Sequence, residues 1–319
     1  VCAVVNMADD GGSSGGLRRD FHIPALGDLR NCLLATAEGD PTLQALFDFR
    51  FKTGVDGHSL GNLMLAALLF LERDLAKAVA RANVLLLAHA RVLPATTANV
   101  ELLAEFADGH MVRGETRIVA EGRPIRKLSL LPGDAEPTAE VLAALAASDL
   151  IVLGPGSLYT SVIPNLLLKG MAAAIARSGA LVALVMNLMT EPGETRGYRG
   201  RDVIAALRQH APALPIHAVV VNDAPLPPGL RERYAARGSV PIAVEPVLLE
   251  GMGYRCRSLP LLAQGVKIRH DPVKLAESLL VLAGAARADS GARALLGARR
   301  EFASPPSPLA VRAGRSVGP

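Results

Sequence analysis

The sequence has no tryptophan, and aromatic residues make up only 3% of its 319 positions. Half of its residues are nevertheless hydrophobic, so a sizeable core must be built from leucine, valine, alanine and isoleucine. The net charge of +4 comes mostly from arginines spread along the chain. Because basic runs interleaved with aromatic residues are absent, this charge is only a weak argument for nucleic-acid binding, and no nucleic-acid partner is predicted. Arginines scattered near glycine loops suit small phosphorylated ligands as well as they suit nucleic acid.

Cysteine and long apolar runs are scarce as well. The spacing of Cys2, Cys32 and Cys256 fits neither a disulfide framework nor a zinc site. The most apolar stretch, residues 60–71, is too short to cross a bilayer and predicts a buried helix. No signal peptide is visible in the sequence. These absences predict free thiols, a reducing compartment and a cytoplasmic protein without a membrane span.

Apolar, strand-like runs alternate with helix-like segments along most of the chain. This alternation predicts an α/β fold, with a Rossmann-like, mainly parallel sheet covered by helices on both faces. We expect a single domain over residues 1–284 and a disordered tail over residues 285–319, which lack apolar periodicity. The strand-like runs are residues 1–5, 150–153, 181–186 and 217–221.

A β-rich insertion is expected at about residues 92–131. Asp108-Gly109 predicts a hairpin turn between residues 100–106 and the segment from Met111. Glu121-Gly122 predicts a second hairpin, in which residues 117–120 pair with residues 125–130. The insertion would form a subdomain or lid on the α/β frame.

Capping signals place several elements. Asp28 is expected to cap a helix that runs from Leu33, and Asp40-Pro41 starts another helix. One helix is expected to run to Arg177, and Gly284 is suited to end the last one. A short strand is predicted at residues 241–247.

The predicted strands are each followed by asparagine or glycine and then by small, polar or charged residues. In a parallel sheet such loops meet at the carboxyl edge, where α/β folds bind ligands. The clearest is Gly154-Pro-Gly-Ser157, whose glycines permit close backbone approach and whose N–H groups near a helix start suit phosphate. The alternative is a tight, capped turn without a ligand. The candidate ligand-binding residues on these loops are Gly154, Gly156, Ser157, Thr160, Asn187, Asn222 and Asp223.

The loop after the first strand contains two adjacent acids and six small residues. Asp9 and Asp10 have three interpretations: contacts to a ribose hydroxyl, binding of Mg²⁺ with phosphate oxygens, or a solvated turn. They are the candidate metal ligands. Predicted helix starts further along the chain add more polar candidates. For each of them, a purely structural role is the alternative to ligand binding. The candidate binding residues here are Asp9, Asp10, Gly11, Ser13, Ser14, Arg30, Asn31, His58 and Asn62.

Eight segments in order resemble the bacterial gluconeogenesis factor family, which is related to 2-phospho-L-lactate transferase. The most specific are Ala8-Asp-Asp-Gly-Gly-Ser-Ser-Gly15 and Leu153-Gly-Pro-Gly-Ser-Leu-Tyr-Thr-Ser161. The other six are Gly27-Asp-Leu-Arg-Asn31, Asp56-Gly-His-Ser-Leu-Gly-Asn62, Arg91-Val-Leu-Pro-Ala-Thr96, Asn187-Leu-Met-Thr-Glu-Pro-Gly-Glu-Thr195, Asn222-Asp223 and Ile268-Arg-His-Asp271.

The resemblance implies a Rossmann-like fold with an inserted subdomain and a nucleotide ligand such as UDP-N-acetylglucosamine. It implies a cytoplasmic role in cell shape and envelope-precursor supply on gluconeogenic carbon sources, with protein partners that remain unknown. A homo-oligomer is left open. Family members have a further strand and a Gly-Gly-Gly-Thr-Gly loop ahead of the segment matching residues 1–5. Its absence predicts a truncated sequence; a protein without it would lack one wall of the phosphate site.

Two functions follow from the resemblance. The first is a regulatory protein that binds a UDP-sugar, with the diphosphate against the Gly154 loop and paired with Arg269. The alternative for Arg269 is an ion pair with Asp271. The second is a transferase that moves a phospho-lactyl or phosphoenolpyruvyl-type group from a guanosine-linked donor to a deazaflavin with Mg²⁺. No catalytic residue is predicted, and NAD binding rests on the fold alone.

Overall fold

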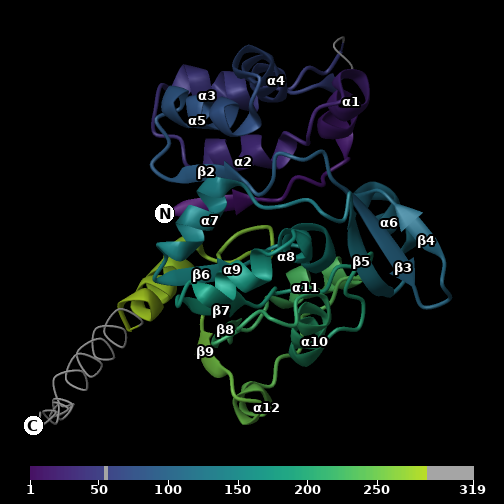
Figure 1. Ribbon diagram of the computed structural model, residues 1–319. Helices are drawn as coiled ribbons and strands as arrows, with labels where there is room; N and C mark the ends of the chain where they lie inside the picture. Colours follow the sequence, from purple (N-terminus) through teal and green to yellow (C-terminus); the bar gives the residue numbers. More distant parts are fainter. Residues whose placement is uncertain (54–56, 286–319) are drawn as a thin grey trace, which may run out of the picture.

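The computed structural model describes residues 1–53 and 57–285. Its main sheet has four parallel strands in the order β6-β7-β8-β9, and a second parallel sheet pairs β1 with β2. An antiparallel sheet, β4-β3-β5, lies to one side of both (Figure 1). The parallel strands are β1 (Cys2–Val5), β2 (Arg91–Pro94), β6 (Leu150–Leu153), β7 (Leu181–Val185), β8 (Ala218–Asn222) and β9 (Arg255–Leu259).

Both faces of the main sheet are buried by helices. In β7, Val182 belongs to the larger core cluster, whereas Ala183 belongs to a second cluster with Leu275 of the helical segment 272–285. Strands buried on both faces are continuous apolar runs, which explains the sequence pattern and confirms the predicted α/β fold. The other helices are α1 (Gly12–Phe21), α2 (Gly27–Ala35), α3 (Pro41–Asp48), α4 (Leu60–Glu72), α5 (Leu75–Leu85), α7 (Ala139–Ala146), α8 (Ile163–Leu167), α9 (Met171–Arg177), α10 (Gly200–His210), α11 (Pro228–Ala235) and α12 (Pro246–Gly251).

Helices α1 to α5 connect β1 to β2 and lie together on one side of the molecule (Figure 1). The helix start at Asp40 is confirmed, because its side chain accepts a hydrogen bond from Thr42 N at 2.7 Å. The capping role of Asp28 is wrong. Helix α2 begins at Gly27, six residues before Leu33, and Asp28 lies inside its first turn without capping it.

Two apolar helical predictions need correction. The helix predicted up to Arg177 is broken, because a π-helical turn (Leu158–Val162) precedes α8 and Gly170, at φ 84°, separates α8 from α9. Helix α4 is buried on one side only, since Leu71 is 79% exposed.

In the described part of the chain, no single helix is long and apolar enough to span a membrane. One pair of helices, 158–167 and 171–177, meets the criteria of length and composition together, but the pair is bent by 75°.

The insertion is a three-stranded sheet with one helix packed beside it. Its strands are β3 (Glu101–Phe106), β4 (Met111–Arg113) and β5 (Ile125–Leu131), and the hairpin predicted at Asp108-Gly109 is confirmed. The second predicted hairpin is wrong, because residues 115–121 form helix α6 (Glu115–Glu121) and β5 pairs with β3. Gly122, at φ 60°, ends that helix instead of making a hairpin turn.

The C-terminal part differs from prediction in two places. Residues 241–247 make only isolated bridges before Pro246 starts α12, and the last strand is β9. Strand β9 is a half-exposed edge strand with two arginines, so its apolar pattern is faint. Gly284 does not end the last helix, since residues 284 and 285 are still helical. The predicted tail, apart from residue 285, lies outside the described residues.

Side chains of α10 bind the outer edge of β5 and so fasten the insertion. Gln209 Nε2 donates to Arg126 O at 2.6 Å, and His210 Nε2 accepts from Leu128 N at 2.9 Å. His210 Nδ1 lies 2.8 Å from Ala206 O. The ring is therefore neutral, with its proton on Nδ1.

We expect His210→Ala to destabilise the protein by about 1–2 kcal/mol and to speed hydrogen exchange at the Leu128 amide, because a buried N–H loses its acceptor. Burial also lowers the pKa of His210. The unfolded chain then binds the proton more readily, so wild-type stability should fall as the pH drops below about 6.5. Urea unfolding and amide exchange measure both effects. His89→Ala, at an exposed site, is the control; equal behaviour of the two variants would contradict the assignment.

Candidate functional site

The loop after β6 is held by Asn187, which follows β7. Asn187 Nδ2 donates to Gly156 O at 2.8 Å, and its Oδ1 accepts from Gly156 N at 3.3 Å. Gly154 has a φ of 77°, a conformation that strains any residue with a side chain. The two loops therefore form one continuous wall at the carboxyl edge of the main sheet.

Glu194 connects that wall to the segment after Ser157. It accepts hydrogen bonds from Thr160 Oγ1 and Tyr159 N, both at 2.8 Å. Asn6, directly after β1, donates to Thr160 O at 2.8 Å, so the ends of β1 and β6 are tied together. Burial raises the pKa of Glu194 to about 7, with a contribution from Glu191. The Thr160 hydroxyl therefore serves the protein's own network.

Asp9 and Asp10 bind different parts of the molecule. Asp9 Oδ1 accepts from Gly11 N at 2.9 Å, and its Oδ2 lies toward α2, 3.0 Å from where a Cβ on Gly27 would stand. Asp10 Oδ1 accepts from Thr116 N at 2.9 Å and from Thr116 Oγ1 at 2.6 Å. Asp10 therefore holds the start of α6, while Asp9 faces the start of α2.

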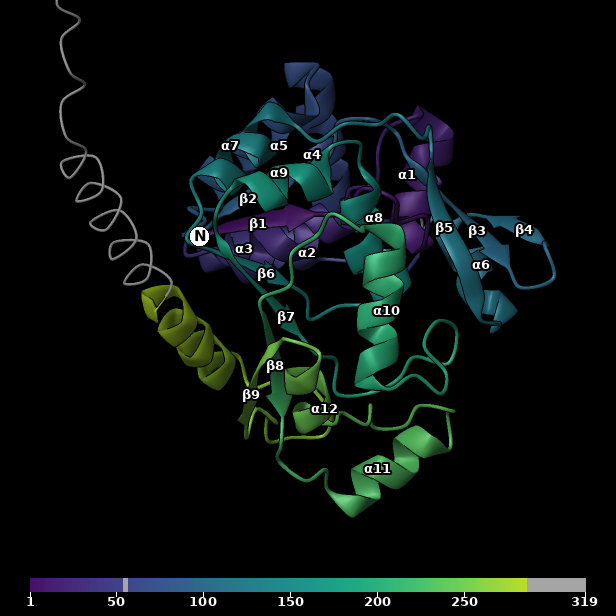
Figure 2. The ribbon, with the colours of Figure 1, turned by 60° about the horizontal axis from the view of Figure 1, so that its bottom comes forward.

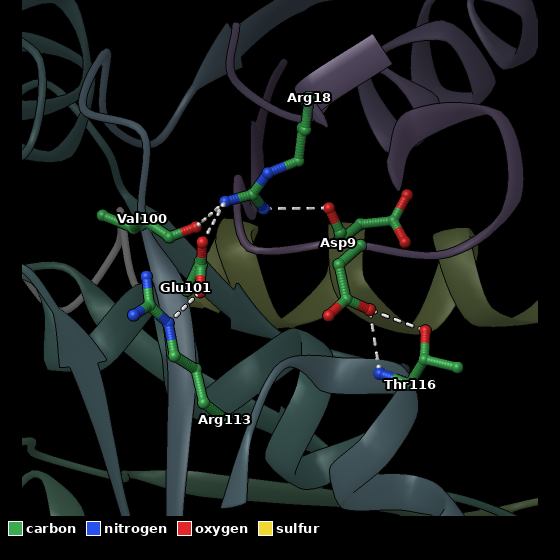
Figure 3. A network of polar contacts seen from close by, with 7 residues as sticks. Asp9, Arg18, Val100, Glu101, Arg113 and Thr116 are labelled. Carbon is green, nitrogen blue, oxygen red and sulfur yellow. Dashed lines mark hydrogen bonds and ion pairs between the residues drawn. The ribbon is translucent and has the colours of Figure 1, made fainter. Parts of the chain in front are cut away.

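Arg18 anchors the same loop through its guanidinium (Figure 3). This buried guanidinium donates to Asp9 O at 3.0 Å and to Val100 O at 2.7 Å, and it lies 3.9 Å from Glu101. Glu101 also forms an ion pair with Arg113 of β4. Arg18 therefore joins the acidic loop to the first strand of the insertion.

Glu115, at the start of α6, is a site residue that the sequence analysis missed. Its Oε2 is buried and has no hydrogen-bond partner among the residues that the structure describes. Burial raises the pKa of Glu115 to about 8, and the carboxyls of Asp9 and Asp28 add to the shift. Burial, with help from Asp9, likewise raises the pKa of Asp28. The insertion therefore contributes a carboxyl group to a cluster formed by the loop after β1 and by α2.

A signal for Glu115 was present in the sequence. Gly114-Glu115-Thr116 has the same residues as Gly193-Glu194-Thr195, and the Glu194 carboxyl also raises the pKa of Glu115. Gly193 packs directly against α6, since a Cβ there would stand 2.6 Å from Val119 O. The two like segments therefore lie close together.

The candidate metal ligands can be tested against this geometry. Among residues 1–53 and 57–285, no three His, Cys, Asp or Glu side chains are arranged as a metal centre. Asp9 lies close enough to Asp28 to raise the pKa of that carboxyl. One oxygen of Asp10 is bound by Thr116, and the assignment of Asp9 and Asp10 as metal ligands stays a prediction.

The polar residues of α1 brace neighbouring helices. Ser13 Oγ accepts from Asn62 Nδ2 at 3.0 Å and lies 2.9 Å from His58 Nδ1, and all three side chains are buried. Ser14 Oγ accepts from Gly27 N at 3.0 Å. These contacts position the first turn of α1 against α2 and α4.

Arg30 and Asn31 point away from the acidic cluster. Arg30 is buried and donates to Asn31 Oδ1 at 2.6 Å, while its stem packs on Gly61 of α4. Asn31 lines a shallow groove between α2 and α3, together with Gln44 and Asp48.

A cavity of about 290 Å³ opens at the carboxyl ends of β7 and β8. Asn187 lines it, so one side chain serves both the cavity and the Gly154 loop. Asn222 also lines it, but its Oδ1 accepts from Leu261 N at 2.9 Å and its Nδ2 donates to Ala224 O at 2.8 Å. The residues of its wall are Met186, Asn187, Leu188, Val221, Asn222, Ala224, Pro225, Leu226, Arg231, Pro241, Ile242 and Val244.

Most of the predicted residues fall into two groups, one around α1 and one on the wall and cavity at the carboxyl edge of the main sheet. Asp223 and Arg269 belong to neither group: both are exposed, and no ion pair joins Arg269 to Asp271 in the described part of the chain. Sequence analysis did not single out Arg231, because nothing in the local pattern of α11 distinguishes it from the neighbouring arginines. The residues around α1 are Asp9, Asp10, Gly11, Ser13, Ser14, His58 and Asn62; those on the wall and cavity are Gly154, Gly156, Ser157, Thr160, Asn187 and Asn222.

The variant Glu115→Gln should be more stable than the wild type, and the difference in their free energies of unfolding should grow as the pH rises. The folded protein holds the Glu115 proton up to about pH 8, whereas the unfolded chain releases it near 4.5, so wild-type stability falls across that window. After a discount for partial exposure we expect a gain on the order of 1 kcal/mol at pH 9 and little at pH 4. Urea unfolding measures it, with exposed Glu232→Gln as control. A pH-independent difference between wild type and Glu115→Gln would refute the burial of a protonated carboxyl.

Comparison with known proteins extends this picture. The family model described as 2-phospho-L-lactate transferase CofD matches residues 1–262. The gluconeogenesis factor of Halalkalibacterium halodurans is 38% identical over 283 residues, covering 88% of each chain. That of Bacillus subtilis is 39% identical over 284 residues, covering 88% of this chain and 89% of the other.

A solved structure agrees with these matches. The crystal structure of a protein from Bacillus halodurans has a TM-score of 0.85 and 38% identity, and covers 88% of this chain and 91% of its own. The resemblance read from the motifs is confirmed: the chain belongs to the 2-phospho-L-lactate transferase CofD family and is similar to the bacterial gluconeogenesis factors within it.

Proposed function

We propose that this protein is a gluconeogenesis factor that binds a UDP-sugar, with UDP-N-acetylglucosamine as the candidate, at the carboxyl edge of its main sheet. The observation that carries the proposal is the position of Asn187. Its amide clamps Gly156 and also lines the cavity beside β7 and β8. A glycine loop suited to phosphate therefore lies next to a concave site.

The size and chemistry of the cavity support a nucleotide. Its volume of about 290 Å³ is at the lower end of ligand pockets, which favours part of a nucleotide in the cavity and the remainder along the loop. Its wall combines apolar side chains with Asn187, Asn222 and Arg231, so it offers both packing surface and polar groups to a ligand. Arg269 is exposed, and a guanidinium there suits a phosphate.

The role we propose is regulatory, in cell shape and envelope-precursor supply on gluconeogenic carbon sources, in the cytoplasm. It rests on the name of the similar proteins, gluconeogenesis factor, and on the character of the loops. Asn187 binds both backbone groups of Gly156, whereas Gly154 and Ser157 offer backbone groups and one hydroxyl to a ligand. They suit binding better than covalent chemistry.

A second function is favoured by the carboxylate cluster. Asp9 and Asp28 lie close enough to shift the pKa of Asp28, and the family model is that of a transferase. With Mg²⁺ bound, these two carboxylates would hold the ion against a donor phosphate, where it would stabilise developing negative charge. Arg18 would keep Asp9 in place through its backbone oxygen.

Calorimetric titration with UDP-N-acetylglucosamine tests the first function. We expect saturable binding by the wild type and at least about tenfold weaker binding by Asn187→Ala, since the loop loses two hydrogen bonds. Asn99→Ala, an exposed asparagine elsewhere, should bind like the wild type. Absence of heat at millimolar ligand would rule out the UDP-sugar.

Mass spectrometry of a deazaflavin acceptor tests the second function. Incubation with protein, a guanosine-linked donor and Mg²⁺ should add the phospho-lactyl or phosphoenolpyruvyl-type group to the acceptor and so increase its mass. The Asp28→Asn variant should abolish this increase in mass. An unchanged acceptor mass in the presence of tight UDP-sugar binding would leave only the first function.

A further inference from the structure

Among the described residues, Arg231 is the one ionisable side chain on the wall of the cavity beside β7 and β8. The other described residues of that wall carry apolar side chains or are the two asparagines, so no carboxylate among them balances the guanidinium. Within residues 1–53 and 57–285, no hydrogen bond or ion pair engages the Arg231 side chain. A concave site with a single, uncompensated cation is complementary to an anion.

The neighbouring arginines, Arg233 in α11 and Arg237 just after it, differ in this respect. Arg233 donates a hydrogen bond to Val266 O, and Arg237, just after the helix, lies on the exposed surface away from the cavity wall. Arg231 is therefore distinguished by its position and not by the composition of α11.

Helix α11 carries Arg231 on a loosely packed arm. None of its residues is buried, and Figure 2 shows it standing apart from the main sheet. In the described part of the chain its side chains make two hydrogen bonds: Arg233 donates to Val266 O, and the Tyr234 hydroxyl accepts from Ile268 N at 3.2 Å. A helix with no buried residue and so few side-chain hydrogen bonds can adjust the guanidinium to a ligand at little cost in packing.

We propose that Arg231 is the residue that selects phosphorylated ligands in this cavity, pairing with the phosphate oxygens while Asn187 binds the Gly154 loop. The phosphates of a nucleoside diphosphate would then lie between the Gly154 loop and α11. The identity of the nucleoside rests on the proposed function. The contact between Arg231 and phosphate does not depend on it.

The test compares Arg231→Gln with Arg237→Gln, which removes an equal charge from the end of the same helix. Dissociation constants are measured for UDP-N-acetylglucosamine, UDP, uridine and inorganic pyrophosphate. Loss of a charge-assisted contact predicts about 10- to 100-fold weaker binding of the three phosphorylated ligands by Arg231→Gln, and under about twofold change for uridine. Arg237→Gln should behave like the wild type throughout. Thermal unfolding verifies that both variants are folded.

The outcomes separate the two proposals. If UDP-N-acetylglucosamine fails to bind the wild type but pyrophosphate binds in an Arg231-dependent manner, the proposed UDP-sugar is wrong and the phosphate site stands. If phosphorylated ligands bind Arg231→Gln as tightly as the wild type, the selection by Arg231 is overturned while the UDP-sugar site stands. Equal weakening of uridine and UDP, equal weakening by the two variants, or no binding of any phosphorylated ligand also overturns it.

Discussion

The hydrogen bonds between the Asn187 side chain and both backbone groups of Gly156 are the interaction on which the candidate site depends. They fix the loop after β6 against the end of β7, where a glycine at positive φ has no side chain to anchor it. The same amide forms part of the cavity wall. A single side chain thus holds a loop suited to phosphate beside a cavity. Without that side chain, the loop would no longer be fixed relative to the cavity.

Carboxyl groups dominate the neighbouring end of the site. Asp9, Asp28 and Glu115 come from three distant segments, and burial raises the pKa of the last two. Keeping such groups together costs free energy unless protons or cations neutralise them. Arg18 is the buried cation beside them, and it holds the backbone of Asp9 in place. The cluster is therefore poised to take up or release charge when a ligand binds.

The insertion belongs to this site and is not a peripheral addition. Thr116 at the start of α6 binds Asp10, and α10 holds β5 through Gln209 and His210. These contacts bring Glu115 into the carboxyl cluster. Movement of the insertion would alter the charge of the site, because Glu115 would regain water and lose its proton.

The sequence by itself determined the α/β class, the polar loops after the strands, the Asp40 cap, the first hairpin and the family, because each depends on local periodicity or on contiguous motifs. It failed at β9 and residues 117–120, where an edge strand shows little apolar pattern and Glu-Gly serves a helix end as well as a hairpin. Only the tertiary structure decided that Asp10 binds Thr116 of the insertion, that Glu115 lies near Asp28, and that Arg231 lines the cavity. Such long-range contacts depend on how segments far apart in the chain pack together. A local sequence pattern does not predict the direction in which a side chain will point.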